Sequence, residues 1–359
     1  MNQTTTADAV MLPTDFERQQ IFFWLQRVSS LTAWRRIFEF YKTWATATEN
    51  SAREADDRGW GDKTALPQAE YALILKGLAH CEEGMLRLGK GNKRVFKFDA
   101  NGEFAMARRI LFHWAEMTTR IEMGENIIDE KHTPRWGEFC ETLTSACQAW
   151  QECAIHILEP RYLGEPGRTL YGDWLRAELK VMPFPKDLAA VPNPSDNTFV
   201  STDNYTPCSG IWEPIEVPKA PFLSLLTGTP KPQAPFKIMG AMNYLHEGSK
   251  APQLTVETET DNLNLDTTWR LLWRDDRYGE VGFPEEEALY RFTEPKEVRA
   301  SSPGVWTADE TTWAESGAAA SVTGRWLVES DLHTSITLEE GQKLPLHQGR
   351  EVRWVLAND

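Results

Sequence analysis

The chain has 359 residues, of which 41% are hydrophobic and 11% aromatic, and its formal net charge is −15. This length predicts about two domains, and the composition excludes a disordered chain. The five cysteines are odd in number and include no Cys-x-x-Cys pair, so neither a disulfide framework nor a zinc site is expected.

The N-terminus lacks the features of a targeting segment. It begins Met-Asn-Gln-Thr-Thr-Thr-Ala-Asp, without a basic region or an apolar core. The strongest apolar run, Ile21 to Leu25, is too short to cross a bilayer. We therefore expect a cytoplasmic protein that does not insert into a membrane.

Apolar residues recur at helical spacing from Asp15 to about Pro160. This spacing predicts a bundle of four helical segments, the first of which is one long helix or a helix pair, and a further short helix over 171–179. Polar or glycine-rich sequence separates the segments. Their apolar positions include Trp24, Leu31 and Tyr41 in the first, Tyr71 and Leu78 in the second, Phe104 and Ile121 in the third, and Trp136 and Ile157 in the fourth.

Proline-rich sequence at 182–194 ends the helical pattern, because such sequence cannot continue a helix. Short β-branched or aromatic pieces follow and alternate with turn residues, which predicts strands. The expected fold class is α+β, with a helical domain over 1–190 and a mainly antiparallel β domain over 191–359. The strands are expected at 198–201, 210–217, 236–239, 254–259, 268–273, 324–329, 335–338 and 352–356.

The β region repeats a Gly-x-Trp motif, whose three copies are Gly210 to Trp212, Gly304 to Trp306 and Gly324 to Trp326. Two copies lead to a Glu-Gly-x-Lys-x-Pro turn and then to a Trp-containing strand, with Gly248 and Trp269 in one and Gly341 and Trp354 in the other. We expect two copies of one supersecondary unit, at about 208–273 and 321–357. The glycine admits a close backbone approach at the strand entry, and packing is the favoured role of the tryptophans over ligand contact.

The first copy carries a long proline-rich insertion between Trp212 and Gly248, which is a surface excursion of the sort that binding proteins use. The net charge is −3 over residues 1–190 and −12 over residues 191–359. An acidic surface disfavours nucleic acid and speeds encounter with a basic protein, although acidity also serves ordinary solubility.

No motif for catalysis or for a cofactor is present. A nucleotide-binding glycine loop, a His-Glu-x-x-His sequence and a Gly-x-Ser-x-Gly sequence are all absent. Cys147, Cys153 and His156 form the best metal-like group, but their helical spacing does not converge on one ion. Asp331 and His333 are favoured as a strand-end turn rather than an acid–base pair. We expect no enzyme activity, no metal and no cofactor.

An acidic stretch between 275 and 287 is the strongest candidate for partner binding. It has two interpretations: a solvated loop followed by an acidic first helical turn, or an acidic surface with aromatic anchors that meets a basic partner. The candidate partner-binding residues are Asp275, Asp276, Tyr278, Glu280, Glu285, Glu286 and Glu287.

Several segments together carry a resemblance to a known family. The helix that contains Leu31-Thr-Ala-Trp34, the motif Cys208-Ser-Gly-Ile-Trp212-Glu-Pro214 and the second Gly-x-Trp with its turn are similar to polymorphic-toxin immunity proteins of the types numbered 71 and 72. The middle copy, at 299–306, departs from the pattern because it has no glycine-lysine-proline turn of its own.

The resemblance implies a cytoplasmic, non-catalytic immunity protein that binds a cognate antibacterial toxin of a type VI secretion system. The charge of residues 191–359 favours a nuclease toxin with a basic cleft. A carbohydrate-binding or adaptor module is the alternative, and it predicts Trp212 or Trp326 in an exposed row. An enzyme with an unfamiliar site would require a deep pocket lined by titratable groups.

Overall fold

A computed structural model of the chain describes residues 11–98, 102–160, 169–216, 232–257, 262–294, 313–328, 331–347, 349–350 and 352–356. Helices come first and antiparallel sheets follow, which confirms the expected α+β class. The chain divides into two compact units, Met1–Val298 and Arg299–Asp359. The change from helix to strand near residue 190 therefore lies inside the first unit, and the first β region shares that unit with the helices.

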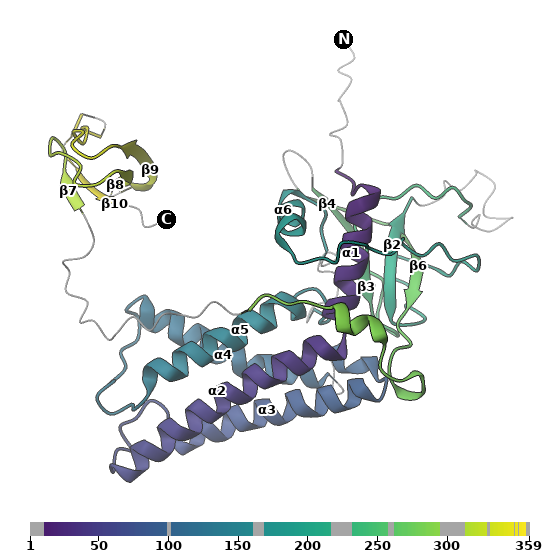
Figure 1. Cartoon of the computed structure of the whole chain (residues 1–359), viewed down its shortest axis with the longest axis horizontal. Coiled ribbons are helices and arrows are strands. Elements are labelled where there is room, and N and C mark those ends of the chain that lie inside the picture. The colour runs from purple at the N-terminus through teal and green to yellow at the C-terminus, as the bar shows by residue number, and fades with distance from the viewer. Residues whose placement is uncertain are drawn as a thin grey trace. The chain divides into compact units, whose positions relative to one another are not determined.

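The first unit begins with helices, four of which run side by side as a bundle (Figure 1). Trp34, Trp44 and Trp150 are buried in the bundle, and Trp34 stacks on Phe104 with 3.9 Å between ring centroids. These aromatic rings bury much apolar area and fix how the helices pack. The helices are α1 Asp15–Val28, α2 Leu31–Asp57, α3 Gln68–Gly89, η1 Lys93–Phe96, α4 Glu103–Glu122, α5 Trp136–Ala154 and α6 Asp173–Val181, and the bundle consists of α2, α3, α4 and α5.

The first predicted segment is a helix pair, because the chain breaks at Ser29 and Ser30. Ser30 caps α2, since its hydroxyl accepts a hydrogen bond from Ala33 N at 3.1 Å. Thr14 and Glu17 form a capping box at the start of α1. The break lets α1 leave the direction of α2 and lie across the β sheet (Figure 1).

The first β region is a sheet with strand order β1-β6-β2-β3, and all its pairings are antiparallel. Residues 199–274, which contain it, are called the first module below. The strands β3 and β5 were not expected, and 236–239 forms no strand, although Ile238 makes one bridge to Ile215. The strands are β1 Phe199–Ser201, β2 Gly210–Ile215, β3 Asn243–Leu245, β4 Leu254–Glu257, β5 Asn262–Leu265 and β6 Thr268–Arg274, of which β4 and β5 pair separately.

The described part of the second unit, residues 313–356, is called the second module. Its strand order, β7-β10-β8-β9, matches that of the first module strand for strand. Adding 114 to the residue numbers of β1 gives β7, and adding 114 to the first five residues of β2 gives β8. Adding 85 to Trp269 in β6 gives Trp354 in β10. The strands are β7 Trp313–Glu315, β8 Gly324–Val328, β9 Asp331–Leu338 and β10 Arg353–Leu356.

The two modules also share their turns. The N–H of Gly248 donates to Thr206 O at 2.8 Å, and the N–H of Gly341 donates to Ala320 O at 2.8 Å. Both glycines have positive φ, +72° and +86°, which explains their place in the turn. The two modules therefore share individual turn hydrogen bonds as well as a strand order.

The tryptophans of the repeat are packing residues. Trp212, Trp269, Trp326 and Trp354 are at most 3% exposed. The indole of the second tryptophan of each module donates to a proline carbonyl, from Trp269 to Pro252 at 2.8 Å and from Trp354 to Pro345 at 3.0 Å. The exposed row that a carbohydrate-binding module would need at Trp212 or Trp326 is thus contradicted. Gly304, Trp306 and residues 217–231 of the proline-rich insertion lie outside the described residues.

The sheet of the first module has two different faces. Trp212 and Trp269 point into a small core of the module itself, whereas Ile211 packs into the large cluster of the helices. Arg18 of α1 forms a 2.8 Å ion pair with Glu213, whose side chain is 2% exposed. Helix α1 therefore covers the face that carries Ile211 and Glu213.

We predict that Gly210→Ala destabilises the first unit. A Cβ at Gly210 would lie 2.2 Å from the carbonyl oxygen of Trp273, so strand β6 must shift. The expected loss in the free energy of unfolding is about 1–3 kcal/mol, measured by urea denaturation of the full chain. Gly137→Ala is the control, because no heavy atom lies within 4 Å of its Cβ position. Equal midpoints for the two variants would contradict the prediction.

Candidate functional site

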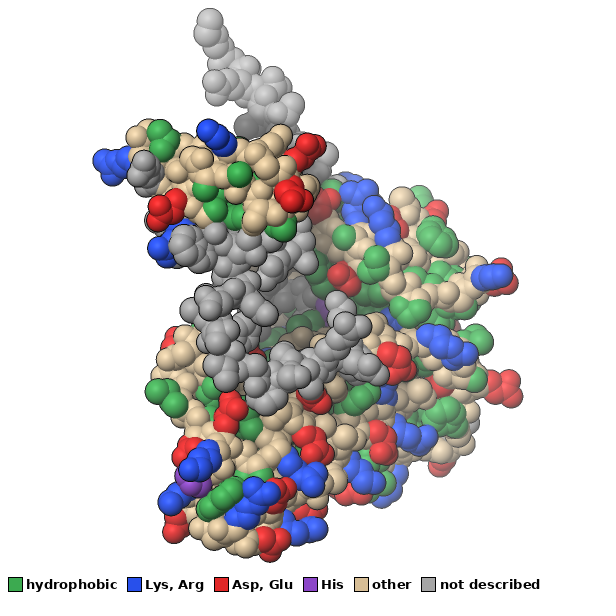
Figure 2. Space-filling model, turned by 60° about the vertical axis from the view of Figure 1, so that its left-hand side comes forward, with side chains coloured by type: hydrophobic (Ala, Val, Ile, Leu, Met, Phe, Trp, Pro, Cys, Tyr) green, Lys and Arg blue, Asp and Glu red, His purple; other side chains and the backbone are tan. Residues whose placement is uncertain are grey.

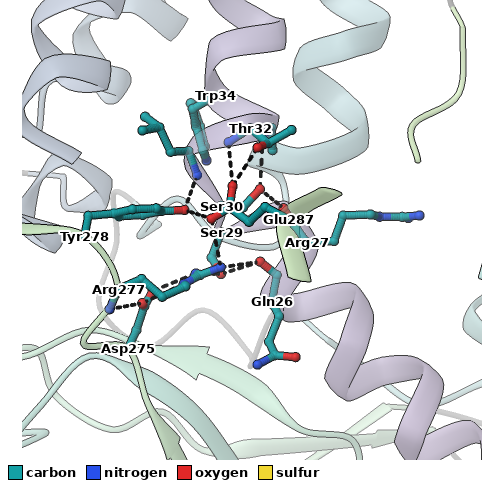
Figure 3. Close-up of polar contacts among 12 residues, drawn as sticks. Gln26, Arg27, Ser29, Ser30, Thr32, Trp34, Asp275, Arg277, Tyr278 and Glu287 are labelled. Atoms are coloured by element: carbon teal, nitrogen blue, oxygen red, sulfur yellow. Dashed lines mark hydrogen bonds and ion pairs between the residues drawn. The ribbon is translucent and has the colours of Figure 1, made fainter. Parts of the chain in front are cut away.

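The predicted acidic stretch follows strand β6 and contains two short helices, η2 Gly279–Val281 and η3 Glu285–Leu289. The structure separates its seven candidate residues into two groups. Asp276, Glu280, Glu285 and Glu286 are exposed, whereas Asp275, Tyr278 and Glu287 are buried. The buried three face the junction of α1 and α2 (Figure 3).

Asp275 and Arg277 form a buried ion pair. Arg277 Nε lies 2.8 Å from Asp275 Oδ1 and Arg277 Nη2 lies 2.8 Å from Oδ2, and both side chains are at most 5% exposed. The same guanidinium donates to Gln26 O at 2.9 Å and to Ser29 Oγ at 2.7 Å. Gln26 has one of the last four carbonyls of α1, so Arg277 places a cation where the helix dipole favours it.

Glu287 and Tyr278 form hydrogen bonds with the N-terminal end of α2. The carboxylate of Glu287 accepts hydrogen bonds from Thr32 N at 3.1 Å and Thr32 Oγ1 at 2.6 Å. The Tyr278 hydroxyl donates to Glu287 and accepts from Leu31 N. These N–H groups belong to the first turn of α2, where an anion is favoured. The stretch after β6 thus satisfies both helix ends at the Ser29–Ser30 break.

Lys93 and Tyr244 complete the network around Asp275. Lys93 Nζ lies 3.2 Å from Asp275 Oδ1, and the Tyr244 hydroxyl donates to Oδ2 at 2.8 Å. Burial lowers the pKa of Lys93 to about 8, although Asp275 opposes that shift. Burial alone would raise the pKa of Asp275, but Arg277 and Lys93 outweigh burial and hold this pKa below its ordinary value.

The buried network is electrically balanced. Its two cations, Lys93 and Arg277, match its two anions, Asp275 and Glu287, and each of the four charged groups contacts an opposite charge or a helix end. Charged side chains that are buried and paired in this way do not attract a partner protein electrostatically. The chemistry of this arrangement is therefore the joining of the helices to the sheet, and four of the seven candidate residues remain exposed.

The exposed carboxylates lie among basic side chains. Asp276 and Glu280 line a cavity of about 690 Å³, whose wall also contains Lys90, Arg94 and Arg274. Arg274 Nε lies 2.9 Å from Asp276 Oδ1. Glu285 and Glu286 on η3 form no ion pair with any residue in the described ranges.

Sequence reasoning missed Arg277 and Lys93, which hold the network together. Arg277 lies inside the acidic stretch, so a basic residue among carboxylates is a local signal for an ion pair. Lys93 is 182 positions before Asp275 in the sequence, and no local signal connects the two. Only the fold brings them together.

The described residues include no group of three or more His, Cys, Asp or Glu residues that could hold a metal ion. None of their helices is long and apolar enough to cross a membrane.

The geometry defines an α+β protein in which a helical bundle and a β module are joined by a buried polar network. Comparison with known families gives each part a match: residues 12–167 match Immunity protein 71 and residues 192–291 match Immunity protein 72. The chain belongs to the polymorphic-toxin immunity proteins. No curated protein and no solved structure matches it significantly.

The network is built from residues of both matched regions. Gln26, Ser29 and Lys93 belong to the first region, whereas Asp275 and Arg277 belong to the second. The two family regions of this chain therefore build one compact unit with a shared polar core. Residues beyond 291, including the second module, lie outside both matches.

We predict that Asp275→Asn strongly destabilises the first unit. The substitution leaves Lys93 without its counter-charge and Arg277 with only Glu287, 4.0 Å away, which costs about 3–5 kcal/mol in the free energy of unfolding. Asp276→Asn is the matched control, because Asp276 is exposed and, in the part of the chain that the structure describes, its ion pair is with the exposed Arg274. Chemical denaturation at neutral pH measures both variants, and equal stabilities would contradict the structural role.

The effect of Asp275→Asn also depends on pH. The folded pKa of Asp275 lies below its unfolded value of about 4. Its contribution to stability is therefore present above that unfolded value and is lost as the pH falls through the folded pKa. We expect the stability difference from the unchanged protein to shrink below about pH 4. A constant difference down to acid pH would contradict this assignment.

Proposed function

We propose that this protein binds the cognate toxin of its producing cell and neutralises it by stoichiometric contact, without a catalytic step. The observation that carries the proposal is the pair of immunity-family regions, which together cover the helical bundle and the first module. The proposed toxin is a nuclease effector of a type VI secretion system, and the proposed place of action is the cytoplasm.

The charge of the chain supports a basic partner. The formal net charge is −15, and residues 191–359 account for −12 of it. An enzyme that binds nucleic acid presents a basic cleft, which an acidic inhibitor can approach quickly. On the face shown in Figure 2, acidic and basic side chains are interspersed rather than separated. The partner would therefore be met by a local surface and not by a uniform acidic field.

Glu285 and Glu286 are the proposed steering residues of that surface. Both are exposed on η3, and Phe283 beside them is 52% exposed and offers an aromatic anchor. Aromatic anchors flanked by charge are typical of protein interfaces. Glu287 is excluded from this role because its carboxylate is bound to Thr32 and Tyr278.

Co-expression tests the proposed function directly. A sensitive bacterium would express the toxin domain encoded beside this gene, with and without the full chain. We expect the chain to restore growth and to co-purify with the toxin in a fixed ratio. If growth is not restored and no complex forms, the proposal is wrong.

We predict that Glu285→Lys with Glu286→Lys slows association with a basic toxin. Reversing two exposed charges should lower the association rate constant by about threefold to tenfold at low salt and weaken its dependence on ionic strength. Stopped-flow mixing with the inactivated toxin domain measures both quantities.

The control reverses two exposed carboxylates of the helical bundle, Glu82→Lys and Glu116→Lys, and so makes the same change in net charge. Equal rate constants for the two double variants would show that η3 is not part of the encounter surface. Thermal unfolding of both variants should match that of the unchanged protein, because all four side chains are exposed.

A further inference from the structure

The cavity of about 690 Å³ in the first unit has one wall from each family region. Residues 90–97, between α3 and the end of η1, form the helical wall. Residues before β2, after β3 and around the end of β6 form the opposite wall. The walls are in direct contact, since Lys97 Nζ donates to Glu247 O at 3.2 Å and Lys93 Nζ donates to Arg277 O at 3.0 Å. The cavity is therefore preformed in the folded unit.

The charged residues of the helical wall are all basic. Lys90, Lys93, Arg94 and Lys97 lie within the eight residues Lys-Gly-Asn-Lys-Arg-Val-Phe-Lys, which include no acidic residue. Lys93 is buried and has its counter-charge in Asp275, 3.2 Å away. The other three cations form a local basic surface in a chain whose formal net charge is −15.

These three cations have no counter-charge among the residues that the structure describes. Lys90 and Arg94 are exposed and form no ion pair there, and the Lys97 ammonium donates only to a backbone carbonyl of the opposite wall. Arg274 of that opposite wall, in contrast, pairs with Asp276 at 2.9 Å. Charges of one sign that line a cavity focus the field at its opening. The helical wall therefore favours a group of opposite charge from another molecule.

The opposite wall decides which class of anion fits. It contains the exposed carboxylates Glu247, Asp276 and Glu280. A nucleic acid has a charged phosphate at every nucleotide and would bring some of them against these carboxylates. A protein segment has charges on separate side chains, and protein interfaces match such charges locally. Phe98, which follows the helical wall, is 44% exposed and adds an aromatic side chain of the kind common at protein interfaces.

We propose that this cavity receives acidic side chains of the cognate toxin, whose carboxylates pair with Lys90, Arg94 and Lys97. This inference rests on the proposed function. The contact is opposite in sign to the proposed steering contact of Glu285 and Glu286, so the two contacts together fix one orientation of the toxin. The reversed orientation would bring like charges together, which is unfavourable.

The test reverses the two exposed cations. Lys90→Glu with Arg94→Glu is compared with the unchanged full chain by titration calorimetry with the inactivated toxin domain encoded beside this gene. We expect the double variant to bind at least about tenfold more weakly, because toxin carboxylates would then meet like charges. The direction of the effect is diagnostic. The variant is more acidic than the unchanged chain, so a general attraction to a basic toxin would make it bind more tightly.

The matched control is Lys42→Glu with Lys76→Glu on α2 and α3, which makes the same change in net charge. Both lysines are exposed and form no ion pair within the described part of the chain. We expect this control to bind at least as tightly as the unchanged protein. Weakening of the control by the same factor as the Lys90 and Arg94 variant would overturn the inference, because the effect would not depend on the cavity.

A neutral variant covers the case in which charge reversal disturbs the fold, since Lys90 follows the last turn of α3, where an anion is unfavourable. Lys90→Gln with Arg94→Gln removes both positive charges without adding negative ones. We expect it to weaken toxin binding by about threefold or more. Unchanged affinity of this folded variant would overturn the inference by itself.

The toxin side gives a direct test of the carboxylates. In toxin variants that replace single acidic residues with lysine, at least one substitution should weaken binding to the unchanged chain and strengthen binding to the Lys90 and Arg94 reversal. If no toxin substitution has both effects, the cavity does not receive toxin carboxylates.

The remaining outcomes separate the two proposals. If the unchanged protein does not bind the toxin domain, both the proposed function and this inference are wrong. If it binds and the folded charge reversal binds like the control, only the inference is wrong. If the reversal abolishes binding of inorganic phosphate or of a short single-stranded RNA to the chain but leaves the toxin affinity unchanged, the cavity takes phosphate groups, and the inference is overturned.

Discussion

The architecture of the first unit depends on the buried pair of Asp275 and Arg277. Arg277 reaches the carbonyl end of α1, while Glu287, which follows in the same stretch, reaches the amide end of α2. The positive charge of Arg277 and the negative charge of Glu287 each match the dipole of the helix end that they contact. One segment after β6 therefore stabilises a sharp break between two helices. Without that break α1 would continue the line of α2, and the face of the first module that carries Ile211 and Glu213 would have no cover.

Because these charged groups are buried and paired, they are not available for binding a partner. Burying an ion pair costs desolvation energy, which only a fully satisfied network offsets. Asp275 meets that condition through Arg277, Lys93 and Tyr244. Some of the acidic residues that the sequence suggests for partner binding are therefore buried inside the unit. The exposed ones that line the cavity lie among basic side chains. Binding by such a surface relies on local anchors and shape more than on a uniform field.

Features that depend on residues close together in the sequence could be predicted. Helical spacing located the bundle, and the Gly-x-Trp motif with its turn located both modules, because turns and strand entries are local. The spacing predicted either one long helix or a helix pair at Ser29–Ser30, since the apolar positions continue across the break. The burial of Asp275 and Glu287 could not be predicted, because their partners Lys93 and Thr32 are distant in sequence. Strands as short as β3 and β7 give too little alternation to recognise.

The two modules share the parts that stabilise the sheet and differ at positions where the first module meets a helix. Both keep the strand order, the glycine turn and the buried tryptophan pair, which are the parts that make the sheet stable. They differ in one register row on the face opposite the tryptophans, where the first module has Glu213 and Arg270 and the second has Leu327 and Val355. Glu213 is buried and pairs with Arg18 of α1, so this carboxylate belongs to the contact between sheet and helix and not to the fold of the module itself.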